Sequence, residues 1–130
     1  MVIDTSAVIA ILLNEGMTER LGRAIRAAPA RRMSAASVVE AGIVIQGRLR
    51  NAGERSLDRL VDHLEVEVIA FTEEHARIAR TAYRRFGRGH HPAKLNYGDC
   101  VSYALARALG EPLLFVGDDF SQTDIDVAPY

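Results

Sequence analysis

Short apolar runs that alternate with helical patterns are the feature of this chain that most limits its fold. Val2 and Ile3 form a β-branched pair that is followed by a polar turn and by a helical segment over about residues 6–13. Residues 66–70 and 112–116 are two further apolar runs of strand length, and each has a helical pattern beside it. Strands that alternate with helices favour a parallel sheet, so we predict an α/β fold with a short, mostly parallel central sheet flanked by helices.

The remaining apolar residues recur at the spacing of one helix face. Helices are predicted over residues 18–28, 37 to about 52, 54–64, 72–86 and 96–108. Thr72 and Asn96 can cap the last two, Arg32-Met33-Ser34 is at best a short strand, and residues 87–92 form a loop. A chain of 130 residues, with 48% hydrophobic and 25% charged residues, has the size of one domain spanning residues 1–130. It can bury a sufficient core without a disulfide or a structural metal.

The chain carries one cysteine, Cys100, which cannot form an internal disulfide. This usage suits a reducing compartment. The apolar run at residues 8–13 is too short for a signal core or a membrane span. We therefore predict a cytoplasmic protein that does not enter a membrane.

Acidic residues fall where the predicted strands run into helices. Asp4 follows the first strand, Glu40 and Asp99 lie in the first turns of helices, and Asp118 and Asp119 follow the last apolar run. Sites in open parallel sheets form at the carboxyl ends of the strands. Carboxylates gathered there repel one another unless a divalent cation neutralises them, and oxygen ligands suit Mg²⁺ or Mn²⁺. Phosphodiester hydrolysis by metal-activated water is the reaction that fits.

Each acid taken singly also has a structural interpretation. Glu40 can complete a capping box with Ser37, and Asp99 can answer the helix dipole after Asn96. Asp4 can be satisfied by the backbone of its turn, and the Asp118 and Asp119 pair can form a solvated turn. These interpretations stay open alongside the metal site.

Four segments together resemble the PIN domain, and their order and spacing resemble the VapC-type toxins of bacterial toxin–antitoxin pairs. They are residues 1–7 (MVIDTSA), 37–40 (SVVE), 95–100 (LNYGDC) and 113–120 (LLFVGDDF). The resemblance implies a PIN-like fold and a Mg²⁺-dependent endoribonuclease, for which Mn²⁺ is a plausible substitute. It also implies inhibition by a VapB-type antitoxin that covers the acidic site, and a homodimer or a toxin–antitoxin hetero-oligomer. Structured RNA such as transfer RNA is the substrate class that it implies.

Matched by motif, Asp4, Glu40 and Asp99 become the metal-binding and catalytic core, with Asp118 as a further metal ligand. Asp118 and Asp119 are both candidates for the fourth catalytic acid, because many family members place Asp or Asn where Gly117 stands here. Thr5 or Ser6 would orient a carboxylate or a metal-bound water.

Charge is distributed unevenly along the chain, although the net charge is only −1. No acid lies between Glu74 and Asp99, whereas six cations do, and from Asp99 onward six acids stand against Arg107 alone. The cations are Arg77, Arg80, Arg84, Arg85, Arg88 and Lys94. Such a basic stretch beside an acidic site would attract an RNA backbone without reading its sequence.

Within this stretch we predict that Arg85, Arg88, His90, His91 and Lys94 contact RNA or the antitoxin, whereas Arg77 and Arg80 fit the solvated face of a helix. Tyr97, Cys100 and Tyr103 are interpreted as packing residues, and Gly98 as a point of close approach. The alternative function is a catalytically inactive PIN-like module that binds RNA or protein. A phosphatase with Asp4 as nucleophile fits less well, because Ser6 stands where such enzymes place a second acid.

Overall fold

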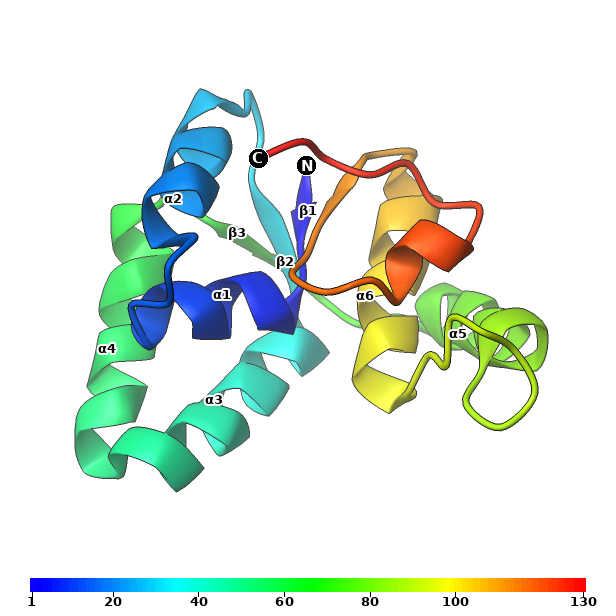
Figure 1. Ribbon diagram of the computed structural model, residues 1–130, viewed down its shortest axis with the longest axis horizontal. Helices are drawn as coiled ribbons and strands as arrows, with labels where there is room; N and C mark the ends of the chain where they lie inside the picture. Colours follow the sequence, from blue (N-terminus) through cyan, green and yellow to red (C-terminus); the bar gives the residue numbers. More distant parts are fainter.

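The computed structural model describes residues 1–130, apart from the side chain of Asn51. The strands β1 (Val2–Ile3), β2 (Arg32–Ser34), β3 (Glu67–Ile69) and β4 (Leu113–Leu114) form one sheet in the order β3-β2-β1-β4. All three pairings in this sheet are parallel. The predicted parallel sheet is confirmed, and Figure 1 shows it at the centre of the molecule.

Helices cover both faces of the sheet, which confirms the α/β prediction. They are α1 (Thr5–Leu12), α2 (Thr18–Ala27), α3 (Ala35–Leu49), α4 (Asn51–His63), α5 (Glu73–Phe86) and α6 (Tyr97–Leu109), with a short 3₁₀ helix η1 (Phe120–Gln122). In Figure 1 the first four lie to one side of the sheet and α5 and α6 to the other. None of the helices described here is both long and apolar enough to cross a lipid bilayer.

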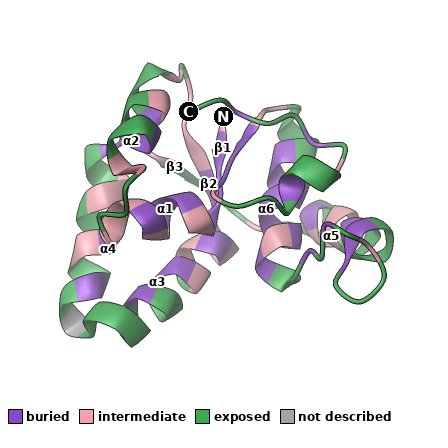
Figure 2. Ribbon diagram, in the orientation of Figure 1, coloured by how far each residue is buried: buried purple, intermediate pink, exposed green. Residues whose placement is uncertain are grey.

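The two-residue strands β1 and β4, which pair with each other, supply residues to both cores. Val2 and Leu113 pack with α5 and α6, whereas Ile3 and Leu114 pack with the helices on the opposite face. This follows from the strand geometry, because successive side chains point to opposite faces of a sheet. Figure 2 shows β1 and the inner faces of the helices as buried. The carboxyl ends of the strands are thereby held against the first turns of α1, α3 and α6.

Most helix boundaries agree with the caps predicted from the sequence. The Thr72 hydroxyl accepts the His75 N–H at 3.2 Å, and Asn96 caps α6. The exceptions are α3 and α4. Helix α3 begins at Ala35 rather than Ser37, because Ser34 at the end of β2 caps it and accepts the Ala36 N–H. Helix α4 begins at Asn51, within the range predicted for the helix before it. The strand at 113–114 is shorter than predicted because its neighbour β1 has only two residues to pair with it.

Candidate acidic site at the carboxyl edge of the sheet

Asp4 lies at the junction of β1 and α1, where it is 3% exposed. Its Oδ2 accepts hydrogen bonds from the Ser6 N–H at 2.9 Å and the Ser6 hydroxyl at 2.6 Å. The Ser6 hydroxyl in turn accepts the Val116 N–H at 3.0 Å. The turn backbone is therefore one partner of this buried carboxylate, as the structural interpretation of Asp4 predicted. Ser6 also ties Asp4 to the chain that follows β4.

Glu40 is oriented by α1 rather than by the cap of its own helix. Because Ser34 caps α3, the capping box predicted from Ser37 and Glu40 is wrong. The Thr5 hydroxyl instead donates to Glu40 Oε2 at 2.7 Å. On its other side the Glu40 carboxylate lies against Gly98, where an added Cβ would overlap both carboxylate oxygens. The close approach predicted at Gly98 is made by this side chain.

Asp99 occupies the first turn of α6, close to the other acids. The Asn96 N–H donates to Asp99 Oδ2 at 2.7 Å, and the Asp99 N–H donates to Asn96 Oδ1 at 3.1 Å. Burial raises the pKa of Asp99 to about 6, against the lowering effect of the Asn96 hydrogen bond. The negative charges of Asp4, Asp119 and Glu40 also raise it. Asp4, Asp119 and Glu40 therefore each lie within electrostatic range of Asp99.

The two candidates for the fourth acid differ in their relation to Asp99. Both follow Gly117, whose φ of 112° turns the chain after β4, and both are exposed. Asp119 is among the charges that raise the pKa of Asp99, and Asp118 is not. The structure thus brings Asp119 toward the cluster, while the backbone carbonyl of Asp118 accepts the Ser121 hydroxyl.

The acids are gathered but are not arranged as a coordination shell. Across the described part of the chain, no three His, Cys, Asp or Glu side chains converge closely enough to hold a metal ion. Instead, Asp4, Glu40 and Asp99 each have one oxygen held by a nearby donor. The donor set consists of carboxylates and is under mutual repulsion, and such a set fits a hard divalent cation.

Three of the five predicted RNA or antitoxin contacts have partners inside the protein. Arg85 forms an ion pair with Asp124 at 2.9 Å and lies over the Phe86 ring. His90 Nε2 lies 3.0 Å from the Tyr83 carbonyl and 3.1 Å from the Arg84 carbonyl at the end of α5, and His91 Nδ1 accepts the Ala93 N–H. Arg88 and Lys94, the other two predicted contacts, are exposed.

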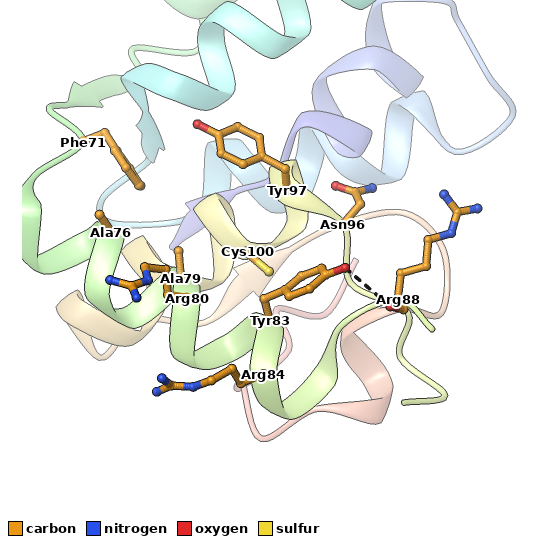
Figure 3. Close-up of a pocket in the computed structure, with 10 residues that line it drawn as sticks. All are labelled: Phe71, Ala76, Ala79, Arg80, Tyr83, Arg84, Arg88, Asn96, Tyr97 and Cys100. Carbon is orange, nitrogen blue, oxygen red and sulfur yellow. Dashed lines mark hydrogen bonds between the residues drawn. The ribbon is translucent and has the colours of Figure 1, made fainter. Parts of the chain in front are cut away.

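A mostly apolar groove of about 720 Å³ lies between α5 and α6 and shares the first turn of α6 with the acidic cluster. Phe71, Tyr83 and Tyr97 line it, together with Arg80, Arg84 and Arg88. Figure 3 shows Arg80 and Arg84 extending outward from α5, and the dashed line marks the Tyr83 hydroxyl donating to the Arg88 carbonyl.

The groove was not apparent from the sequence. Tyr97 was interpreted as a packing residue, which is wrong, because it is 73% exposed. Helical spacing places it on the same side of α6 as buried Val101. That pattern cannot reveal that the neighbouring elements leave the first turn of α6 uncovered.

The chain is similar to known proteins in both sequence and fold. The sequence matches the PIN domain family over residues 1–126. It is 50% identical to Ribonuclease VapC of Mycolicibacterium smegmatis over 125 residues, which cover 96% of this chain and 97% of that protein. It is 48% identical to Ribonuclease VapC30 of Mycobacterium tuberculosis over 125 residues, with coverage of 96% and 95%.

Two solved structures share the fold. The crystal structure of Mycobacterium tuberculosis VapC20, a sarcin-ricin loop cleaving toxin, superimposes with a TM-score of 0.79 at 18% identity and covers 98% of each chain. A toxin–antitoxin complex from Klebsiella pneumoniae superimposes with a TM-score of 0.71 at 21% identity, covering 99% of this chain and 97% of that one.

Replacement of Asp99 by Asn should stabilise the metal-free protein at neutral pH. Folding raises the pKa of Asp99 from 3.8 to about 6. The ionised carboxylate therefore destabilises the folded state at pH values above about 6, and this destabilisation disappears as the pH falls below 3.8. We expect Asp99→Asn to raise the free energy of unfolding by about 1–3 kcal/mol at pH 7.5 and by much less at pH 4. Urea unfolding in EDTA measures this. Exposed Asp58→Asn is the control, and a less stable Asp99→Asn variant at pH 7.5 would contradict the assignment.

Replacement of Gly98 by Ala should displace the Glu40 carboxylate, because the added methyl group overlaps it. Since the overlapped atoms are the end of a flexible side chain, we expect a loss of only about 0.5–1.5 kcal/mol in the free energy of unfolding, from the broken hydrogen bond between Thr5 and Glu40. The matched control is Gly47→Ala, where nothing lies within 4 Å of the added Cβ, and which should be neutral or stabilising. Thermal unfolding compares the two. Adding Gly98→Ala to a Glu40→Ala variant should cause little further loss, and an undiminished loss would show that the overlap lies elsewhere.

Proposed function

Because the chain belongs to the PIN domain family and, within it, to the VapC proteins, we propose that it is a metal-dependent endoribonuclease that acts as the toxin of a VapBC toxin–antitoxin pair. The relatives that match it at about half identity are named ribonucleases. The observation that carries the proposal is the electrostatic coupling of Asp99 to three other carboxylates at one edge of the sheet. A cluster of this kind is stable in its charged form only with a cation beside it.

The proposed metal ligands are Asp4, Glu40 and Asp99, with Asp119 as the fourth acid. Asp119 is preferred to Asp118 because its charge acts on Asp99. Mg²⁺ is the proposed ion and Mn²⁺ a substitute, since both take carboxylate oxygens and retain waters. When bound, such a cation supplies positive charge for the phosphate and increases the acidity of the attacking water.

The chain's own residues prepare the site for an in-line attack on the phosphodiester. Thr5 holds one oxygen of Glu40, and Ser6 holds one oxygen of Asp4. These bonds fix the orientation of the two carboxylates. In the metal-free protein the pKa of Asp99 is about 6, so in mild acid a cation has to compete with a proton for this carboxylate. RNA cleavage at limiting Mg²⁺ is therefore expected to fall as the pH is lowered through mild acid.

An RNA substrate would meet exposed cations beside the site. Arg84, Arg88 and Lys94 are exposed in the stretch that contains no acid. They would attract the phosphate backbone and position it without reading the bases. Since Arg85, His90 and His91 are already engaged within the protein, the proposed contact set is centred on Arg88 and Lys94. Structured RNA, transfer RNA included, is the proposed substrate class.

A VapB-type antitoxin is the proposed protein partner, with a segment that covers the acidic cluster. The structural similarity to a toxin–antitoxin complex supports this proposal. We propose that both proteins act in the cytoplasm, where the RNA substrates are. An inactive RNA- or protein-binding module remains the second candidate, because no three acids converge to hold a metal in the described residues.

RNA cleavage by the antitoxin-free protein tests the function. Wild type should cleave RNA with Mg²⁺ and lose activity in EDTA, and Asp4→Asn and Asp99→Asn should each reduce cleavage roughly 100-fold or more. Asp119→Asn should also reduce it, whereas Asp118→Asn serves as the neighbouring control. Equal cleavage by wild type and the Asp4 and Asp99 variants would contradict the proposal. Absence of both cleavage and Mn²⁺ binding, measured by calorimetry, would favour the inactive module.

We also propose that a second copy of the chain covers the exposed apolar surface next to the site. Val39 and Ile43 lie one turn apart on α3 and are 63% and 67% exposed. Tyr97 lines the groove, and its neighbour Gly98 lies against Glu40, which follows Val39 on α3. Tyr97 therefore continues this surface into the groove. Apolar surface of this kind on both α3 and the groove supports a homodimer.

Light scattering coupled to size-exclusion chromatography measures the oligomeric state. The wild type should elute at about twice the chain mass of 14.3 kDa, and Ile43→Asp should elute as a monomer because a buried unpaired charge opposes association. Leu109→Asp, at an exposed apolar residue on the far end of α6, should leave the dimer intact. A monomeric wild type would contradict this proposal.

A further inference from the structure

The segment that carries Asp119 leaves the sheet after β4 and returns to it. The Leu113 N–H donates to the Asp126 carbonyl at 2.8 Å, and the Ala128 N–H donates to the Leu113 carbonyl at 2.9 Å. Between these points, Phe120 is 1% exposed and its ring lies 4.9 Å from that of Phe115. The backbone next to Asp119 is therefore anchored, although its own side chain is exposed.

A junction of three side chains joins this segment to α5 and α6. Asp124 Oδ1 accepts a hydrogen bond from the Tyr103 hydroxyl at 2.6 Å, and Asp124 Oδ2 forms an ion pair with Arg85 Nη2 at 2.9 Å. Tyr103 is 3% exposed and packs against Phe86, and the Arg85 guanidinium lies 4.5 Å from the centre of the same ring. We call this junction the Tyr103–Asp124 clamp. It uses both oxygens of one carboxylate, one for a buried hydroxyl and one for a cation.

The clamp differs from an ordinary surface ion pair, which contributes little. Burial raises the pKa of Tyr103 to about 12, and the hydrogen bond to Asp124 adds to this, so the hydroxyl remains a donor at any working pH. Although burial by itself raises the pKa of Asp124, the hydrogen bonds from Tyr103 and Arg85 hold that pKa below its ordinary value. Hydrogen bonds to an ionised group are also stronger than those between neutral groups.

The clamp links the two chain segments that carry Asp99 and Asp119. Tyr103 follows Asp99 by four residues on α6, which is about one helical turn, and Asp124 follows Asp119 by five residues. Asp99 and Asp119, at the other end of this arrangement, are both carboxylates, and like charges repel when the segments that carry them are held together. The clamp holds the two segments together from the opposite end.

We propose that Tyr103, Asp124 and Arg85 are positioning residues, which hold Asp119 beside Asp99 against the repulsion of the two carboxylates and so set the affinity of the acidic cluster for a divalent cation. This inference rests on the proposed function. It also gives Arg85 a role different from the RNA contact that the sequence predicts, since its guanidinium is held by Asp124 and Phe86.

Mn²⁺ binding to the full chain without RNA, measured by calorimetry, tests the clamp apart from catalysis. Tyr103→Phe keeps the packed ring and removes the donor, and Asp124→Asn keeps an acceptor for Tyr103 and removes the charge that holds Arg85. These two variants and the single variant Arg85→Gln should each weaken Mn²⁺ binding about fivefold to tenfold, which is the size of effect expected for residues that act through others. Arg77→Gln is the control, because Arg77 is an exposed α5 arginine in a 3.9 Å pair with Glu73.

Cleavage kinetics separate the clamp from an RNA contact. The clamp predicts a lower kcat at limiting Mg²⁺ that recovers at high Mg²⁺, with KM for RNA unchanged in all three variants. A raised KM in Arg85→Gln alone would overturn it and restore Arg85 as an RNA contact.

Unchanged Mn²⁺ binding in all three variants would overturn the clamp and leave the proposed function standing. A wild type that neither binds Mn²⁺ nor cleaves RNA would instead refute the proposed function. If Tyr103→Phe unfolds, half-exposed Arg85→Gln carries the test.

Discussion

The candidate site depends on the position of β1, a strand of two residues that pairs in parallel with β2 on one side and β4 on the other. Val2 and Ile3 are buried in opposite cores, so the strand cannot shift without exposing one of them. Asp4 follows directly and is buried with it. The turn that satisfies this carboxylate, through Ser6, also brings the first turn of α1 against α3. From this first turn of α1, the Thr5 hydroxyl donates a hydrogen bond to Glu40 on α3.

The ionised Asp99 carboxylate at this edge makes the folded protein less stable at neutral pH than a neutral side chain there would. The pKa of Asp99, near 6, reflects this loss of stability. Burial and the negative charges of Asp4, Asp119 and Glu40 raise that pKa. The hydrogen bonds from Asn96, Thr5 and Ser6 offset part of the repulsion. Natural proteins retain such local conflicts where a site needs them. Here the conflict lies at the proposed cation site.

Several of the sequence predictions depended on local information, and these were the ones confirmed. The caps at Thr72 and Asn96, the buried thiol of Cys100 and the parallel sheet follow from residues near one another or from simple periodicity. The wrong ones depended on distant contacts. Ser34 displaced Ser37 as the cap of α3, and Tyr97 lies open because no other element covers it. No pattern within α5 indicates that Arg85 pairs with Asp124, which lies beyond the next helix and strand.

The sequence by itself determined the alternation of strands and helices and the placing of acids at strand ends, because hydrophobic periodicity and capping chemistry act over a few residues. It also indicated which family the chain resembles. Only the tertiary structure decided which acids act on one another, that Asp119 rather than Asp118 influences Asp99, and which cations are already engaged. Electrostatic coupling and burial depend on distances between segments far apart in the chain, and those distances exist only once both cores have packed against the sheet.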